Sequence, residues 1–367
     1  MKKTDKKKHS VFTKESTEFL YKYLNNSSPT GYESSGQQIW LEYLKPYIDD
    51  YIVDAYGSVA AVINPGQDYK VVIEAHADEI SWYVNYITPE GFIYVCRNGG
   101  SDHQIAPSKR VNIYTEKGIV KGIFGWPAIH VREPGKEEPP TLKNIFVDIG
   151  ASSKKEAEKM GVHVGCVMTY EDELIELNEK FLVGRALDNR IGGFMIAQVA
   201  RLLIENGIKL PYTLYIVNSV QEEIGLRGAE MISRRIKPDV AIITDVCHDT
   251  TTPMMDKKVQ GEIACGKGPV LSYAPAVQNN VLKLIIQTAE KEKIEFQRLA
   301  SSRSTGTDTD AFAYSAEGVP SALISLPLRY MHTTNETVHK EDVENVVWLM
   351  YHTLRNIKKN HDFRYIK

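Results

Sequence analysis

Short polar clusters follow several apolar segments that we predict to be strands, and these clusters carry the residue types best suited to catalysis. Open α/β sheets place their ligand sites just beyond the carboxyl ends of the strands, so these residues are candidates for one shared site. The clusters are His76–Glu79, Gly184–Arg190, Gln221–Gly225, Asp245, Thr309–Ala311 and Tyr330–Thr333.

Two of these clusters are ambiguous when each is taken alone. His76 and Asp78 would point to the same side of an extended segment, which suits a metal-binding histidine oriented by a carboxylate. An isolated His-x-Asp sequence is nevertheless more typical of a structural histidine. Asp188 and Asn189 precede an apolar segment that we predict to be a helix, so in isolation they fit a helix N-cap better than a metal site.

The carboxylates that follow two other strands favour a functional site more strongly. Glu222 and Glu223 come one residue after the apolar strand predicted over 212–220. Adjacent carboxylates can divide the chemistry, because one can bind a metal ion while the other transfers protons. Asp245 is the only charged residue within 240–246, and a lone carboxylate in such an apolar run requires a cation nearby.

Taken together, the clusters predict metal-assisted hydrolysis. Two Zn²⁺ or Co²⁺ ions about 3.5–4 Å apart need about five such ligands when one carboxylate bridges them. The five candidate ligands are His76, Asp188, Glu223, Asp245 and His332. No cysteine belongs to this set, which argues against a structural zinc site. The sequence contains no Walker A motif, no Gly-x-Ser-x-Gly elbow and no Gly-x-Gly-x-x-Gly after a strand, so nucleotide-dependent and serine-hydrolase mechanisms lack essential parts.

The overall composition excludes further classes of protein. The 367 residues carry 44 Lys and Arg against 47 Asp and Glu, so no excess positive charge is available to bind nucleic acid. No apolar run approaches the ~20 residues that cross a bilayer. The lysine-rich segment 2–8 is not followed by the apolar core of a signal peptide, and the four cysteines are widely spaced. We therefore expect a cytoplasmic protein that binds neither nucleic acid nor membrane.

The elements that must position the candidate residues change in character along the chain. Residues 1–81 and 177–367 alternate helical patterns with short apolar strands, which predicts an α/β sheet covered by helices on both faces. Residues 82–176 are rich in Val, Ile, Tyr and Phe and contain turn signals at 89–91 and 116–118, which predicts a small β-rich domain. We therefore expect a discontinuous α/β domain interrupted by an inserted β domain.

Five motifs occur in the order and spacing of a known family. They are Ala75–Glu79, Gly184–Arg190, Gln221–Gly225, Thr244–Val246 and Arg329–His332. On these motifs the chain resembles the tetrahedral aminopeptidases, which are dinuclear metallopeptidases of the glutamyl and deblocking aminopeptidase type, over about residues 19–354. The sequence departs from the family pattern at Ser58, at Ser81 and in the loop 304–309, and none of these departures removes a candidate ligand or base.

The resemblance implies a role for each candidate metal ligand. His76 and His332 would each bind one metal ion, and Asp188 would bridge the two ions. Glu223 and Asp245 would each complete the coordination of one ion.

The resemblance also implies the proton-transfer groups, the fold and the assembly. Glu222 would be the general base and acid, and Asp78 would orient His76. The catalytic domain would be a phosphorylase/hydrolase-like α/β sandwich, and the inserted β-barrel-like domain would serve oligomerisation. The usual assembly of the family is a hollow tetrahedron of twelve subunits built from dimers.

The sequence thus predicts a metal-dependent aminopeptidase that acts on short peptides. A deacylase or a carboxypeptidase would carry similar metal ligands and a similar base, so another di-metal amide hydrolase is the nearest alternative. A non-catalytic assembly protein that retains the fold is the second alternative, and it would be expected to have lost some of these residues.

Overall fold

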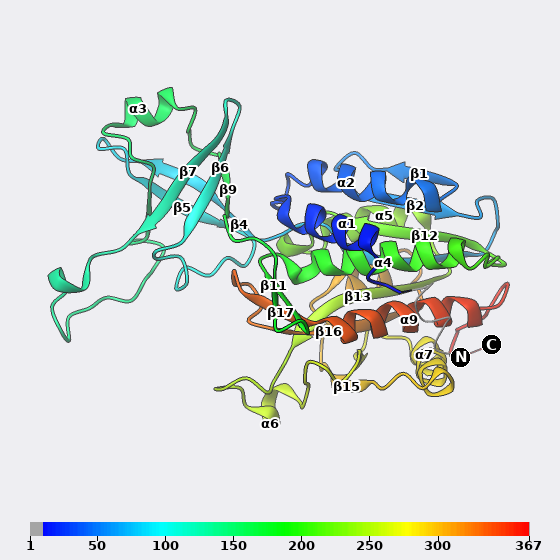
Figure 1. The fold of residues 1–367 in the computed structure, drawn as a ribbon. Coiled ribbons are helices and arrows are strands. Elements are labelled where there is room, and N and C mark those ends of the chain that lie inside the picture. Colours follow the sequence, from blue (N-terminus) through cyan, green and yellow to red (C-terminus); the bar gives the residue numbers. More distant parts are fainter. Residues whose placement is uncertain (1–9, 367) are drawn as a thin grey trace.

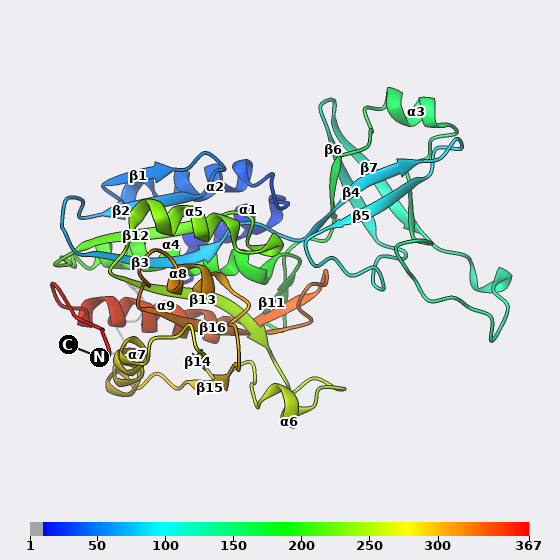
Figure 2. The same ribbon diagram turned by 180° about the vertical axis from the view of Figure 1, so that it is seen from behind.

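The computed structural model describes residues 10–366, and the lysine-rich segment 2–8 lies outside this range. Within it, a mixed sheet of eleven strands with helices on both faces forms the larger body, and a closed six-stranded barrel projects from one end (Figures 1 and 2). The predicted α/β fold with an inserted β-barrel-like module is therefore confirmed. Among the described residues, no helix combines the length and the apolar composition that a membrane span requires.

Four parallel strands form the centre of the large sheet: β12 (Thr213–Ser219), β3 (Lys70–His76), β13 (Val240–His248) and β16 (Ser321–Arg329). Almost every residue of these strands is buried, as expected for parallel strands covered on both faces. The flanking strands, most of which pair in antiparallel fashion, are β1 (Asp50–Val53), β2 (Val59–Ile63), β10 (Ile175–Leu177), β11 (Phe181–Gly184), β14 (Val270–Tyr273), β15 (Gln297–Ala300) and β17 (Glu336–His339).

Helices cover the two faces of this sheet unequally. One face carries α1 (Lys14–Asn25), α2 (Ser34–Leu44), α4 (Leu187–Glu205) and α9 (Lys340–Asn356), with α7 (Asn279–Glu292) beside α9 (Figure 1). The opposite face carries α5 (Arg227–Ile236) and α8 (Asp308–Ala313) (Figure 2). The α4 helix is buried on all sides over its first 17 residues because it lies between the sheet and the outer helices α1, α2 and α9.

The barrel closes in the order β4 (Ser81–Ile87), β5 (Ile93–Asn98), β8 (Phe146–Asp148), β7 (Gly118–Gly125), β6 (Arg110–Thr115) and β9 (Val167–Tyr170). It has a hydrophobic core of its own, centred on Trp82 and Phe124, whose rings meet edge to face. Both turn signals fall between paired strands, where Gly91 and Gly118 adopt the left-handed backbone that favours glycine. A short helix, α3 (Lys154–Lys159), precedes β9.

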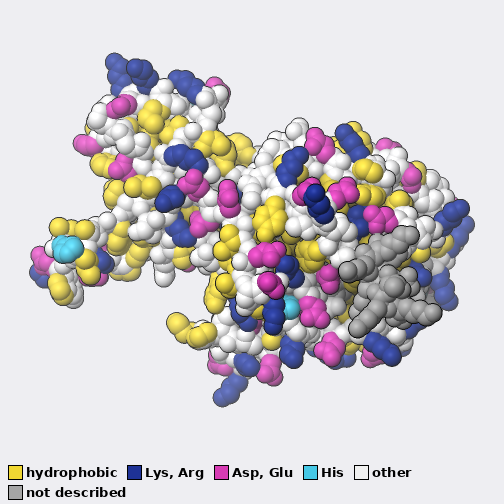
Figure 3. Space-filling view, in the orientation of Figure 1, with side chains coloured by type: hydrophobic (Ala, Val, Ile, Leu, Met, Phe, Trp, Pro, Cys, Tyr) yellow, Lys and Arg dark blue, Asp and Glu magenta, His cyan; other side chains and the backbone are white. Residues whose placement is uncertain are grey.

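A long arm between β7 and β8 extends away from the barrel and contains the 3₁₀ turn η2 (Ile129–Val131). Hydrophobic side chains gather on this projection (Figure 3). Ile129 and Val131 are 67% and 73% exposed. Apolar side chains exposed together in this way commonly mark a protein–protein contact.

Two element boundaries have a clear structural cause. The α2 helix ends at Leu44 and continues only as the 3₁₀ turn η1 (Lys45–Tyr47), because Pro46 has no N–H to extend the α-helical ladder. The strand β13 runs past Asp245 to His248, because Asp245–His248 pair with Ser325–Leu328 of β16.

Candidate active site

The parallel strands deliver most of the candidate residues to one edge of the sheet. His76 is the last residue of β3 and lies opposite Ser219, the last residue of β12. The 3₁₀ turn η3 (Glu222–Ile224) follows β12 at once, and His332 follows the end of β16. Because parallel strands place their carboxyl ends together, residues that are distant in sequence become neighbours here.

Asp188 reaches this edge from the start of α4, and the helix N-cap interpretation of Asp188 and Asn189 is wrong. Neither side chain caps the helix among the described residues, because no side-chain cap hydrogen bond is present and Asn189 Oδ1 has no hydrogen-bond partner, and the backbone of both residues is non-helical. The peptide bond between them is cis. Asn189 Nδ2 donates a hydrogen bond to the carbonyl of Thr244 (2.8 Å), and the Asp188 carboxylate faces two histidines.

Asp188 lies between the two candidate histidine ligands, with one carboxylate oxygen towards each. Its Oδ1 is 3.3 Å from Nε2 of His76, and its Oδ2 is 3.3 Å from Nε2 of His332. A carboxylate that presents separate oxygens to two imidazoles has the geometry of a bridging ligand.

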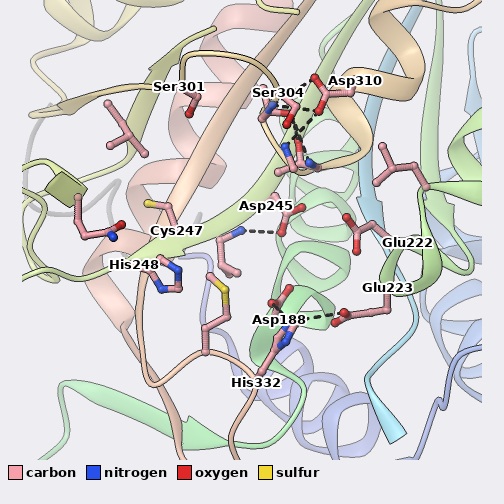
Figure 4. A pocket seen from close by; sticks show the side chains of 18 of the residues that line it. Asp188, Glu222, Glu223, Asp245, Cys247, His248, Ser301, Ser304, Asp310 and His332 are labelled. Carbon is pink, nitrogen blue, oxygen red and sulfur yellow. Dashed lines mark hydrogen bonds and ion pairs between the residues drawn. The ribbon is translucent and has the colours of Figure 1, made fainter. Parts of the chain in front are cut away.

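The remaining carboxylates surround this pair on the inside of the site (Figure 4). Glu223 Oε2 is 3.4 Å from His332 Nε2. Asp245 Oδ1 and Glu222 Oε2 are 3.9 Å and 3.8 Å from His76 Nε2. The structure thus brings together all seven residues that the sequence selected.

Asp78 contacts both His76 and the turn that carries Glu222 and Glu223. Its Oδ1 is 3.4 Å from Nδ1 of His76, whereas Asp188, Glu222 and Asp245 approach the other ring nitrogen, Nε2. The Asp78 carboxylate accepts hydrogen bonds from the backbone N–H of Glu222 (3.0 Å) and of Glu223 (3.2 Å), and from the Thr30 hydroxyl (2.9 Å). Asp78 therefore links the histidine to the turn that carries both glutamates.

The site contains more carboxylates than histidines, so negative charge is in excess there. Burial raises the pKa of Glu222 to about 10, and nearby carboxylates such as Asp245 add to the increase. Burial and the Asp188 charge raise the pKa of Asp245 to about 8 and that of Glu223 well above its ordinary value. Burial acts in the same direction on Asp188, but its bonds to His332 and His76 outweigh it and lower the pKa.

These residues fit a divalent metal centre. Ligand atoms of His76, Asp188 and Glu223 lie within 4.8 Å of one another, as do those of His76, Glu222 and Asp245. Glu223 Oε1 is buried and has no hydrogen-bond partner among the described residues. An unpaired carboxylate oxygen is costly in a buried position, and a cation would satisfy it while neutralising the crowded negative charge.

A cavity of about 750 Å³ opens onto these residues. Its floor carries Asp188, Glu222, Glu223, Asp245 and His332, and the walls come from the strand β13 and the loop before α8. The volume lies within the range of pockets that enclose small organic ligands, so a short peptide end is of suitable size.

Sequence reasoning missed Glu336, which is buried at the start of β17. Its Oε2 accepts a hydrogen bond from the Asp188 N–H (2.9 Å), and its Oε1 accepts one from the His332 N–H (2.8 Å). Glu336 therefore fixes the backbone of two candidate ligands at once. It follows His332 by four residues within a polar stretch, where no pattern distinguishes it from a solvent-exposed glutamate.

Glu79, next to Asp78, forms a buried ion pair that ties the first motif to the second. It contacts the Arg185 guanidinium, lies 3.7 Å from Arg190, and accepts a hydrogen bond from the Ser28 N–H (2.7 Å). All three charged side chains are almost completely buried.

Replacement of Glu79 should destabilise the fold strongly. Glu79→Ala leaves two buried guanidinium groups without their counter-charge, and we expect a loss of about 3–5 kcal/mol in the free energy of unfolding. Glu176→Ala is the matched control, because its ion pair with Lys340 lies at the surface, where the two side chains are 40% and 26% exposed, and should contribute less than about 1 kcal/mol. Urea denaturation followed by circular dichroism compares the two, and equal midpoints would contradict the expected importance of the buried pair.

The sequence of residues 57–349 matches the family model of the M42 glutamyl aminopeptidases. The chain is 34% identical to the lysyl aminopeptidase of Pyrococcus furiosus over 344 residues, which cover 93% of this chain and 97% of that protein. It is 28% identical to the glutamyl aminopeptidase of Lactococcus lactis over 286 residues, which cover 74% and 76% of the two chains.

Solved structures agree with these sequence matches. A TET aminopeptidase from a marine sediment archaeon of the Thaumarchaeota superposes with a TM-score of 0.88 at 29% identity, covering 94% of this chain and 99% of the other. The Pyrococcus horikoshii TET1 peptidase superposes with a TM-score of 0.81 at 27% identity, covering 92% and 98%. The fold, the site and these relatives together define a peptide hydrolase.

The chain belongs to the M42 glutamyl aminopeptidase family. The resemblance to the tetrahedral aminopeptidases is thereby confirmed.

Proposed function

We propose that this protein is a metal-dependent aminopeptidase that removes N-terminal residues from short peptides. The observation that carries the proposal is the position of Asp188, whose two oxygens face His76 and His332 separately. The relatives are named as aminopeptidases, which favours release of residues from the N-terminus over a deacylase or carboxypeptidase reaction. A cytoplasmic location, expected from the isolated cysteines, remains part of this proposal.

Five residues would hold two divalent ions such as Zn²⁺ or Co²⁺. In this assignment His76 and Asp245 serve one ion, His332 and Glu223 serve the other, and Asp188 serves both. When bound, such ions polarise a scissile carbonyl and lower the pKa of water from about 15.7 towards about 7.

Glu222 would transfer the protons of the reaction. Its carboxylate projects into the cavity beside the candidate ligands and is held there by the bond from its own N–H to Asp78. In our assignment Glu222 accepts a proton from the attacking water and delivers it to the amine that leaves the peptide. Asp78 fixes the His76 ring and the Glu222 backbone at the same time, so it acts as a positioning residue.

Removal of metal should abolish activity. Protein purified without chelator should contain up to two Zn²⁺ or Co²⁺ per chain, and dialysis against a chelator should leave it inactive towards N-terminal aminoacyl-p-nitroanilides until metal is added back. The measurement combines metal analysis with this substrate panel. Full activity in demonstrably metal-free protein would exclude the proposed mechanism.

We further propose that residues 82–176 form an oligomerisation domain, while 1–81 and 177–367 form the catalytic domain. The exposed apolar side chains of the arm, Ile129 and Val131, support an interface there. The Pyrococcus horikoshii TET1 peptidase can assemble into a tetrahedron or a large octahedral shell. By analogy, dimers of this chain would close into a tetrahedral dodecamer around the active sites.

Light scattering on the purified protein should therefore report about twelve subunits, or about 500 kDa for a chain of 41.4 kDa. An enclosed site should trim peptides of a few residues and leave a folded protein with an accessible N-terminus intact.

The double variant Ile129→Asp/Val131→Asp tests whether the arm is an interface, and it should reduce the number of subunits in the assembly. A fully active monomer that degrades both kinds of substrate would contradict the enclosed assembly.

A further inference from the structure

The segment that leaves the barrel after β5 lies directly against two of the candidate metal ligands. A Cβ atom on Gly100 would lie only 2.5 Å from Nδ1 and 2.6 Å from Cε1 of His332. A Cβ atom on Gly99 would lie 3.2 Å from Cβ of Glu223. The backbone of Gly100 is outside the left-handed region, so the close approach to the imidazole, and not backbone conformation, requires glycine at this position.

Buried hydrogen bonds anchor this segment on both sides of the two glycines. Asn98 Nδ2 donates to the carbonyl of Thr30 and to the hydroxyl of Ser81, both at 2.8 Å. The Ser101 hydroxyl donates to the Ser81 carbonyl (2.6 Å). Asn98 and Ser101 are 7% and 1% exposed. The segment around Gly100 is thus anchored to Thr30 and Ser81, and the His332 ring would have to move if Gly100 gained a side chain.

A second contact from the inserted module reaches the same loop. The ammonium group of Lys109, just before β6, contacts the hydroxyl of Thr334, two residues beyond His332. It also lies 3.1 Å from the Asp172 carboxylate. Thr334 is buried. The His332 loop therefore contacts the inserted module at two points.

We infer that the inserted barrel completes the metal centre, with Gly100 and Lys109 acting as positioning residues for His332. The inference rests on the proposed role of His332 as a metal ligand. It assigns the insert a part in the site in addition to its proposed part in assembly. Groups that orient a metal-bound histidine typically change metal affinity about 10–100-fold when they are altered.

Metal binding tests this inference without relying on activity. Chelator-stripped wild type, Gly100→Ala, His332→Ala and the double variant would each be titrated with Co²⁺ by calorimetry, and the bound metal would be counted by elemental analysis. We expect Gly100→Ala to weaken one of the two sites about 10–100-fold and to leave the other unchanged. The double variant should bind as His332→Ala does, because residues acting through one ligand are not additive.

Gly125→Ala is the matched control. Its Cβ would lie 2.6 Å from the Phe146 ring, which is a clash of similar severity in the same barrel but away from the site. It should bind Co²⁺ as wild type does. Denaturation midpoints of all variants show whether each one is folded.

Each result separates the inference from the proposed function. Wild type that binds fewer than two ions contradicts the two-metal proposal itself. Wild type that binds two, with Gly100→Ala indistinguishable from it, overturns the inference. A loss of affinity that persists when Gly100→Ala is added to His332→Ala also overturns it. If Gly100→Ala does not fold, Lys109→Met decides: it should weaken the same site, and unchanged binding would overturn the inference.

Discussion

Glu222→Gln should lower kcat about 10²–10⁴-fold and leave the metal content at the wild-type level. The substitution keeps the shape of the side chain and removes only its ability to accept a proton. The backbone N–H of residue 222 would still donate to Asp78, so the turn that also carries Glu223 should stay in place. Steady-state kinetics on an aminoacyl-p-nitroanilide, together with elemental analysis, measures both quantities.

Metal content is the informative half of this experiment. The carboxylate of Glu222 lies within ligand range of His76 and Asp245, so the geometry also permits it to bind metal. Loss of metal in Glu222→Gln would identify it as a ligand and contradict its assignment as the base. Glu230→Gln is the matched control, because Glu230 pairs with Arg227 on the surface of α5 and should retain full kcat.

Asp188→Ala should remove metal and activity together. Both histidine Nε2 atoms face this one carboxylate at 3.3 Å, so its removal takes a ligand from both proposed ions. We expect the purified variant to retain much less than two ions per chain and to show activity near background.

Asp188→Asn separates the charge of this residue from its shape. The amide has one oxygen in place of two and carries no charge. We therefore expect a metal content between that of Asp188→Ala and that of wild type. A variant Asp188→Ala that retains two tightly bound ions would show that the bridge lies elsewhere.

The sequence was sufficient to predict the central strands and the residues that gather near their carboxyl ends. The central strands are mostly apolar, so the charged residues near their carboxyl ends stand out, and parallel strands bring such residues to one edge. The ambiguity at Asp188 could not be resolved in this way. An Asp-Asn pair before an apolar helix is the signature of a cap, and only the tertiary structure shows Asn189 bonded to Thr244 and Asp188 turned towards the histidines.

The supporting residues could not be predicted, because their roles depend on contacts across the fold. Glu336 accepts hydrogen bonds from backbone N–H groups of two distant segments. Gly100 can approach the His332 ring closely because it has no side chain. Neither residue type nor spacing reveals such contacts. Sequence patterns selected the candidate ligands and base, whereas the residues that position them became visible only in the structure.

The position of β3 in the sheet determines how late in translation the large sheet and the candidate site can be completed. This strand ends in His76, and its two neighbours, β12 and β13, begin only at residues 213 and 240. Translation therefore completes all six barrel strands before it produces either neighbour of β3, and His332 is the last candidate ligand to be made. A chain interrupted at any point before residue 332 would lack a complete centre, so a nascent or truncated polypeptide would be spared a premature peptidase activity.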